Sequence, residues 1–162
     1  MWTRAFRNIT GVVEPAVNRL PTGSEVDAWR SFLRAHARLV RVLESELVAE
    51  HPLSLGGYDV LVQLAEAPER RLRMAELADA VLLSRSGVTR LVDRLEVAGM
   101  VTRERFTGDG RGVVAVLTTK GVDTLRQAAR THLGGVVRHF IDHFDAKELA
   151  EFGELCARLA DS

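Results

Sequence analysis

The segment 74–117 constrains the fold of this chain more than any other part of the sequence. Apolar residues recur at helical spacing over 74–81 and again over 84–98. Two strand-like runs, 101–106 and 113–117, then enclose a glycine-rich tip. A short helix, a tight turn, a second helix and a two-stranded wing together predict a winged helix-turn-helix, an architecture that places one helix in the major groove of DNA.

The rest of the chain is predicted to be largely helical. Apolar periodicity predicts helices over 24–50, 57–66 and 118–144, and a last helix that begins at Asp145. Ser24 is the expected N-cap of the first of these, and Asp145 with Glu148 is expected to form a capping box. Residues 68–71 are expected to form a turn. Residues 1–23 carry a helical seam interrupted by glycine and proline, which predicts a short helix or an arm.

The positive charge of the chain is concentrated in one segment. The chain has 22 basic and 22 acidic residues, so its zero net charge excludes a polycationic binding tail. Its 46% hydrophobic content excludes a disordered acidic chain. Residues 70–112, however, contain nine arginines and six acidic residues. We therefore expect any nucleic acid to bind to this part of the chain.

Cysteine usage and hydropathy indicate the compartment. The one cysteine, Cys156, cannot form an intramolecular disulfide, which favours a reducing compartment. No apolar run approaches the roughly 18 residues of a membrane-spanning helix. Residues 1–23 lack the continuous apolar stretch of a signal peptide. We expect a cytoplasmic protein without a membrane partner.

The outer face of the predicted helix 84–98 carries the residue types that DNA recognition needs. Small hydroxyl side chains permit close approach and bind phosphate, and arginine reads O6 and N7 of guanine. The predicted DNA-binding residues of this helix are Ser84, Arg85, Ser86, Thr89, Arg90 and Arg94. An ordinary solvated surface helix is the alternative, but the short helix before it and the wing after it favour DNA binding.

The tip of the predicted hairpin offers a second DNA contact. Arg111 lies between Gly110 and Gly112, and a protruding arginine fits a narrow minor groove, where the negative potential is enhanced. Asp109 is expected to orient Arg111 or to pair with Arg94. The alternative is a tip whose charge is simply solvated.

These motifs in combination resemble those of the MarR family of transcriptional regulators, over about residues 24–160. The resemblance rests on the segments Ala75-Glu76-Leu77-Ala78, Ser84 to Glu96, Gly99-Met100-Val101, Asp109-Gly110-Arg111 and Val116 to Gly121. Asp109 and Arg111 match the family's wing, whereas Gly110 replaces a residue that is usually another arginine. This replacement is expected to remove one phosphate contact.

The resemblance implies a mainly α fold with a small β-hairpin wing. A winged helix-turn-helix DNA-binding domain would span 57–117, and a helical dimerisation region would combine 24–56 with 118–162. Residues 1–23 would form an N-terminal extension. The implied function is that of a homodimeric regulator, a repressor, that binds a pseudo-palindromic double-stranded DNA operator.

The resemblance also implies release from DNA by a small-molecule effector. The expected crevice lies between the dimerisation helices and the DNA-binding lobe, with Trp29, His36, His51 and Tyr58 as candidate ligand-binding residues. Plain packing or surface exposure is the alternative for each of the four. Cys156 occupies an apolar position of the last helix, so a buried inert thiol is expected there rather than an oxidation sensor.

Three other functions compete with this interpretation. A zinc-responsive regulator of the same family would use His139 and His143, four residues apart on one helix, with Asp59 as the implied third ligand. Solvent-exposed histidines are the preferred interpretation, so no metal and no other cofactor is expected.

A winged-helix protein-interaction module would present apolar residues where Arg85, Arg90 and Arg111 stand. An enzyme is not expected, because the sequence lacks HExxH, GxSxG and glycine-rich phosphate-loop motifs.

Overall fold

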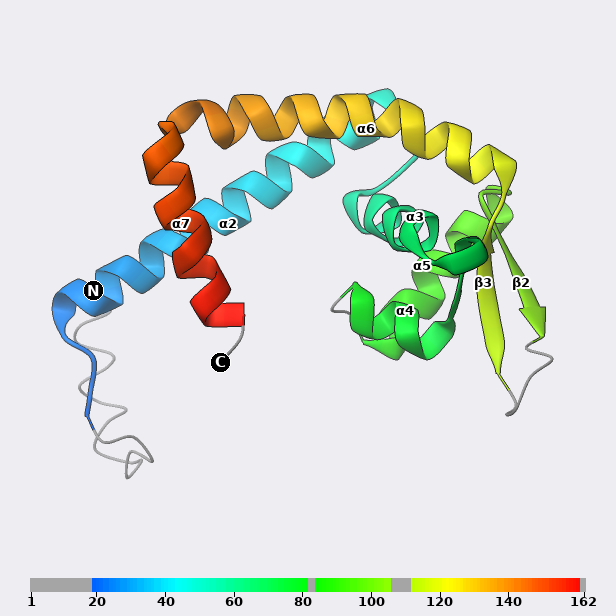
Figure 1. Ribbon diagram of the computed structural model, residues 1–162, viewed down its shortest axis with the longest axis horizontal. Helices are drawn as coiled ribbons and strands as arrows, with labels where there is room; N and C mark the ends of the chain where they lie inside the picture. The colour runs from blue at the N-terminus through cyan, green and yellow to red at the C-terminus, as the bar shows by residue number, and fades with distance from the viewer. Residues whose placement is uncertain (1–18, 82–83, 106–111, 161–162) are drawn as a thin grey trace. The chain divides into compact units, whose positions relative to one another are not determined.

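The computed structural model describes residues 19–81, 84–105 and 112–160 of the chain (Figure 1). The chain divides into two compact units, residues 1–38 and 39–162, with the boundary inside the first described helix. Most of the predicted N-terminal arm, like the predicted wing residues Asp109 and Arg111, lies outside the described residues.

The described elements follow one another in the order that the sequence predicts, with helices before and after a winged helix-turn-helix. Their bounds are α2 Gly23–Glu50, α3 Leu55–Glu66, η1 Pro68–Arg70, β1 Arg71–Arg73, α4 Met74–Ala80, α5 Arg85–Val97, β2 Val101–Arg105, β3 Val113–Leu117, α6 Thr119–His139, η2 Ile141–His143 and α7 Ala146–Ala160. The mainly α fold with a small β wing is therefore confirmed. Among the described residues, no helix is both long and apolar enough to cross a bilayer.

Helix α2 is capped by Thr22, and not by Ser24 as predicted. The Thr22 N–H donates to Glu25 Oε2 at 2.7 Å, and the Glu25 N–H donates to Thr22 Oγ1 at 3.4 Å, which makes a capping box. Arg19 donates to both oxygens of the same carboxylate. The hydrogen bonds from Arg19 and Thr22 lower the pKa of Glu25 to about 2. Ser24 lies inside the first turn, so its assignment as N-cap is wrong.

The winged helix-turn-helix contains one strand more than the sequence predicts. Helices α4 and α5 agree with the predicted helices to within one residue at each end, and β3 has its predicted bounds. The predicted turn at 68–71 is instead the single turn η1 followed by the strand β1. Three residues are too few to show strand alternation in the sequence, which is why β1 is not predicted.

The three strands form one antiparallel sheet in the order β1-β3-β2. Arg103 of β2 lies opposite Ala115 of β3, and Ala115 is fully buried. Directly opposed residues of an antiparallel pair point to the same side of the sheet. The Arg103 side chain therefore leaves the sheet on the side that faces the core.

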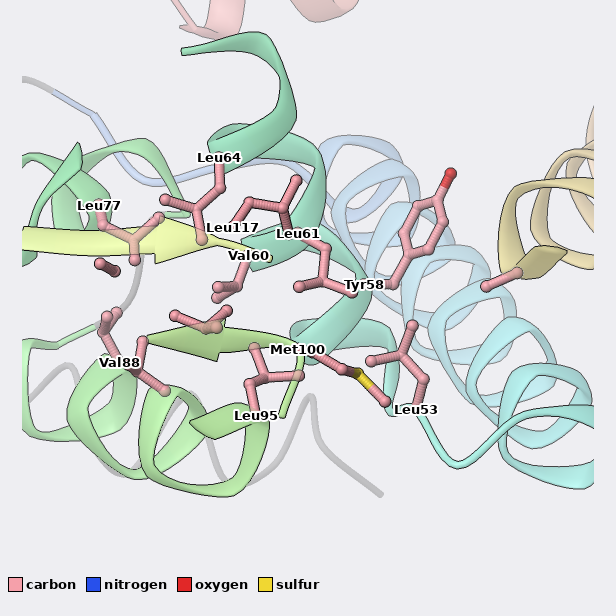
Figure 2. Close-up of a cluster of buried hydrophobic side chains, with 14 of the residues drawn as sticks. Leu53, Tyr58, Val60, Leu61, Leu64, Leu77, Val88, Leu95, Met100 and Leu117 are labelled. Atoms are coloured by element: carbon pink, nitrogen blue, oxygen red, sulfur yellow. The ribbon is translucent and has the colours of Figure 1, made fainter. Parts of the chain in front are cut away.

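Helices α3, α4 and α5 pack with this sheet around an apolar core (Figure 2). The residues of these helices and this sheet that have no solvent exposure are Val60, Leu61, Leu64, Leu77, Val88, Val92, Val101 and Ala115. They come from all three helices and from β2 and β3, so each of these elements is held by side chains of the others. This packing fixes the position of α5 and leaves its opposite face exposed to solvent.

Helix α6 ends at His139, five residues before the predicted end. Phe140 leaves helical geometry at φ −131° and ψ −62°, and the single turn η2 follows. The rings of Phe140, Phe144 and Phe152 lie 5.4–6.0 Å apart. The apolar spacing continues through residue 144 because these rings pack together across the break, and this continuity misplaces the helix end in the prediction.

Helix α7 begins as the sequence predicts. The Asp145 N–H donates to Glu148 Oε2 at 2.9 Å, and the Glu148 N–H donates to Asp145 Oδ1 at 2.9 Å. These two bonds confirm the predicted capping box. No residue of α7 is buried in the single chain. Leu155 and Leu159 are exposed, and Cys156 is partly exposed, so the buried thiol predicted at this position is wrong for the single chain.

Candidate nucleic-acid interface

The N-terminus of α5 is exposed to solvent. Ser84 is the N-cap, and its hydroxyl accepts a hydrogen bond from the Gly87 N–H at 3.1 Å. Ser86 Oγ lies 3.2 Å from Ser84 Oγ, and both residues are exposed. Exposed hydroxyls beside the free N–H groups and positive dipole end of a helix are suited to bind a phosphate.

Helix α5 has one buried face and one polar face. Val88, Val92 and Leu95 are buried in the core. The predicted DNA-binding residues of α5 are all exposed: Arg85, Ser86, Thr89, Arg90 and Arg94. The structure therefore brings these side chains together on the solvent side, where hydroxyl and guanidinium groups can reach phosphates and base edges.

Two of these side chains are oriented by hydrogen bonds to the helix itself. Thr89 Oγ1 donates to the Arg85 carbonyl at 2.8 Å, and Arg94 Nε donates to the Arg90 carbonyl at 3.3 Å. Bonds of this kind limit the rotamers of both side chains. Arg94 is thus oriented by α5 itself, and its predicted pairing with Asp109 concerns a residue outside the described part of the chain.

The base of the wing is joined to α5 by Arg103. Its guanidinium forms ion pairs with Asp93 at 2.7 Å and with Glu96 at 2.6 Å. Neither Asp93 nor Arg103 is among the residues predicted from the sequence to form the DNA interface. The pairing depends on how β2 packs beside α5, which spacing along the chain does not reveal.

A crevice borders α5 on the side of the α2–α3 junction. Its volume is about 290 Å³, and it is lined by Val48, His51, Pro52, Leu53, Ser54, Gly57, Leu91, Arg94, Leu95 and Ala98. It therefore combines an apolar wall with the polar groups of His51, Ser54 and Arg94. His51 Nε2 also lies 2.9 Å from Thr131 Oγ1, which orients the imidazole.

The other three predicted ligand-binding residues lie elsewhere. Trp29 lines a groove of about 790 Å³ on the N-terminal part of α2. His36 stacks on Phe32, with ring centroids 6.2 Å apart. Tyr58 is a buried member of the core, and its ring lies 4.6 Å from that of His132. Of the four residues, His51 is the one that lines the crevice beside α5.

The histidines of α6 contact carboxylates and rings. His139 Nε2 lies 2.7 Å from Glu46 Oε1, and Arg138 donates to Glu46 Oε2 at 3.0 Å. The hydrogen bond from His139 is the main cause of a lowered pKa at Glu46. Among the described residues, no three His, Cys, Asp or Glu side chains are grouped to hold a metal ion. His139 contacts Glu46, and His143 lies on η2, beyond the end of α6.

A second histidine of α6, His132, is partly desolvated. Its Nδ1 is buried and has no hydrogen-bond partner in the described structure. Burial lowers the pKa of His132, and the nearby Asp59 carboxylate opposes the shift. Burial also raises the pKa of Asp59. The pair lies on α3 and α6 and does not belong to the exposed face of α5.

Comparison with known proteins agrees with the architecture. The model of the MarR family matches residues 51–112. The chain is similar to AbsC, a MarR family transcriptional regulator of Streptomyces coelicolor, with 36% identity, a TM-score of 0.82 and coverage of 89% of this chain and 97% of AbsC. It is also similar to Sco3205, a MarR family regulator of the same organism solved in complex with DNA, with 35% identity, a TM-score of 0.85 and coverage of 91% and 92%.

A curated relative also spans nearly the whole chain. The transcriptional repressor YetL of Bacillus subtilis is 28% identical over 96% of this chain and 93% of its own length. Both Streptomyces proteins are more than 30% identical to this chain and are covered almost completely. Together with the winged helix-turn-helix and its exposed arginine-bearing helix, these similarities identify the chain as a member of the MarR family of transcriptional regulators.

Proposed function

We propose that the protein is a dimeric, sequence-specific DNA-binding repressor whose α5 helix enters the major groove. The observation that carries the proposal is the polar face of α5. Its arginines and hydroxyls are all exposed, while the opposite face is fixed in the core. The similar protein Sco3205 was solved in complex with DNA, which supports DNA as the partner of this chain as well.

The roles within α5 follow from side-chain chemistry. Ser84 and Ser86, at the helix N-terminus, would bind a backbone phosphate. Arg90 lies in the exposed middle of α5 and would read guanine, while Arg85 and Arg94 flank it. Thr89 would contact a base edge or a phosphate. Arg111, outside the described residues, remains the proposed minor-groove contact of the wing, and Asp109 is proposed to orient it or to pair with Arg94.

The apolar surface of the last two helices supports the homodimer. Leu133 of α6 is 59% exposed, and Leu155 and Leu159 of α7 are 52% and 68% exposed. Several exposed apolar residues on one pair of helices mark an association surface. A second copy of the chain would cover them, and the two α5 helices would then read the two halves of a pseudo-palindromic operator.

Repression and effector release are further parts of the proposal. The name of YetL as a repressor supports the direction of regulation. The crevice beside α5 supports effector control, because Arg94 lines it and is also a proposed DNA contact. A small anionic aromatic compound bound there would compete with DNA for Arg94. His51 and Ser54 would supply the other polar contacts.

Band-shift titration against a duplex selected by the wild-type protein tests the DNA interface. Arg90→Ala should weaken binding by about 1–3 kcal/mol if Arg90 reads a base. Arg111→Ala should weaken binding and reduce the salt dependence. Arg126→Ala, on the exposed surface of α6, is the matched control and should bind like the wild type. Wild-type affinity in both test variants would refute the assigned interface.

A further inference from the structure

One arginine outside α5 contacts three successive turns of this helix. Arg103 Nη1 donates to Glu96 Oε2 at 2.6 Å, and the Arg103 N–H donates to Glu96 Oε1 at 3.1 Å. Nη2 lies 2.7 Å from Asp93 Oδ1 and donates to the Thr89 carbonyl at 3.2 Å. A single side chain of β2 thus binds α5 at residues 89, 93 and 96.

These contacts are made in a partly desolvated position. The Arg103 side chain is 23% exposed, and it leaves the sheet on the core side, as its register opposite Ala115 requires. Charge-assisted hydrogen bonds are stronger than hydrogen bonds between neutral groups, and partial exclusion of water makes them stronger still. The planar guanidinium reaches both carboxylates and the carbonyl at once, which a lysine ammonium at the end of a single stem does not.

The two carboxylates that Arg103 binds create an electrostatic problem on α5. Asp93 and Glu96 belong to the helix proposed to approach phosphates, and Asp93 is exposed. Uncompensated carboxylates there would repel the DNA backbone. Arg103 places a positive charge directly beside both. The same contacts fix how β2, the first strand of the wing, lies against α5.

We infer that Arg103 is a positioning residue for sequence recognition, because it holds α5 at a fixed angle to the wing and neutralises Asp93 and Glu96. It acts through α5 and does not itself touch a base. The inference rests on the proposed function, since it concerns the helix proposed to enter the major groove. It extends the interface to a residue that faces the core side of the sheet.

This role has a signature that distinguishes it from a phosphate contact. Affinity for any duplex depends mainly on the number of cations near phosphates. Preference for one sequence depends on the geometry of α5 in the groove. Loss of the Arg103 contacts at constant charge should therefore reduce sequence preference and leave affinity for arbitrary DNA nearly unchanged.

Arg103→Lys tests the inference because it keeps the positive charge and removes the planar guanidinium that reaches several acceptors at once. The probes are a duplex selected from a random pool by the wild-type protein and a scrambled duplex of the same composition. We expect the ratio of the two affinities to fall about tenfold in Arg103→Lys, with scrambled-duplex affinity within about twofold of wild type. Arg105→Lys, two residues along the same strand and exposed, is the matched control and should keep the wild-type ratio.

Asp93→Asn breaks the same contact from the helix side, so the test does not depend on one variant folding. It should lower the ratio and raise affinity for the scrambled duplex, because a negative charge leaves α5. Combined with Arg103→Lys, it should lower the ratio by less than the product of the single effects, as expected for residues that share one contact.

Two outcomes would overturn the inference. A wild-type ratio in both Arg103→Lys and Asp93→Asn would show that the contacts do not position α5. Equal weakening on both duplexes in Arg103→Lys would make Arg103 a plain phosphate contact. A wild-type protein without any sequence preference would instead refute the proposed function, and the inference with it.

Discussion

The winged-helix region, residues 55–117, and helix α7 use similar amphipathic patterns but end in opposite states of burial. The core of the winged-helix region contains eight residues with no exposed surface, while α7 has no buried residue and leaves Leu155 52% exposed. The apolar periodicity of a helix therefore shows which face is to be covered. It does not show whether the same chain covers it.

The largest expected contrast between the two regions comes from matched truncations of leucine. Leu61→Ala removes a side chain from the closed core (Figure 2) and should lower the free energy of unfolding by about 2–5 kcal/mol through lost burial and a residual cavity. Leu155→Ala removes no buried contact within its own chain. It should weaken self-association, as measured by sedimentation equilibrium.

Protein concentration separates the two effects. The stability loss in Leu61→Ala, measured by urea unfolding, should be the same at low and high protein concentration. Any loss in Leu155→Ala should depend on concentration, because it acts through the proposed dimer. If Leu155→Ala left both self-association and stability unchanged, α7 would not belong to the dimer interface.

Much of the winged-helix region could be predicted because its boundaries are encoded by local chemistry. Ser84 caps α5, and Gly99 adopts a positive φ of 72° directly after it, which is the conformation that glycine favours at a helix end. The α6 boundary lacks such a signal at residue 139, and its apolar spacing runs on to Phe144. The predicted helix is therefore too long there.

The interface could be predicted only where it lies on one element. The exposed row of α5 follows from helical periodicity, so the sequence predicts Arg90 and its neighbours together. The ion pair between Arg103 and Asp93 joins a strand to a helix. The spacing of the two residues along the sequence does not predict that they are in contact. The grouping of His51 with Arg94 around one crevice depends on tertiary packing in the same way.

A smaller contrast separates the two ends of α6. A Cβ at Gly121 would overlap the Met100 carbonyl oxygen and lie 2.6 Å from Leu117 Cδ1. Because a backbone carbonyl cannot move aside cheaply, Gly121→Ala should lower the free energy of unfolding by about 1–3 kcal/mol. A Cβ at Gly134 would lie 3.1 Å from the terminal nitrogen of the exposed Arg138 side chain, which can move.

Gly134→Ala is accordingly the matched control within the same helix. It should be neutral or stabilising by up to about 1 kcal/mol, because alanine favours helix more than glycine does. Thermal unfolding of the two variants at one concentration provides the measurement. Equal stability of Gly121→Ala and the wild type would show that α6 does not begin in close contact with the residue-100 turn.

The smallest expected effect concerns pH and the contact between α3 and α6. Burial lowers the pKa of His132 in the folded protein from its ordinary value of 6.5, so the unfolded chain binds a proton more readily. Below about pH 6.5 the unfolded state therefore gains more protons, and stability should fall as the pH falls. The raised pKa of Asp59 acts in the opposite direction, but at the lower pH where a carboxyl group titrates.

His132→Phe tests this assignment because it keeps a ring against Tyr58 and removes both the titration and the unpaired Nδ1. Urea midpoints at pH 5.5 and 7.5 should differ less in this variant than in the wild type. His143→Gln, which replaces an exposed imidazole on η2, should keep the wild-type difference. If His132→Phe also kept it, the acid sensitivity would arise elsewhere, and the α3–α6 contact would be held by packing alone, as the core of the winged-helix region is.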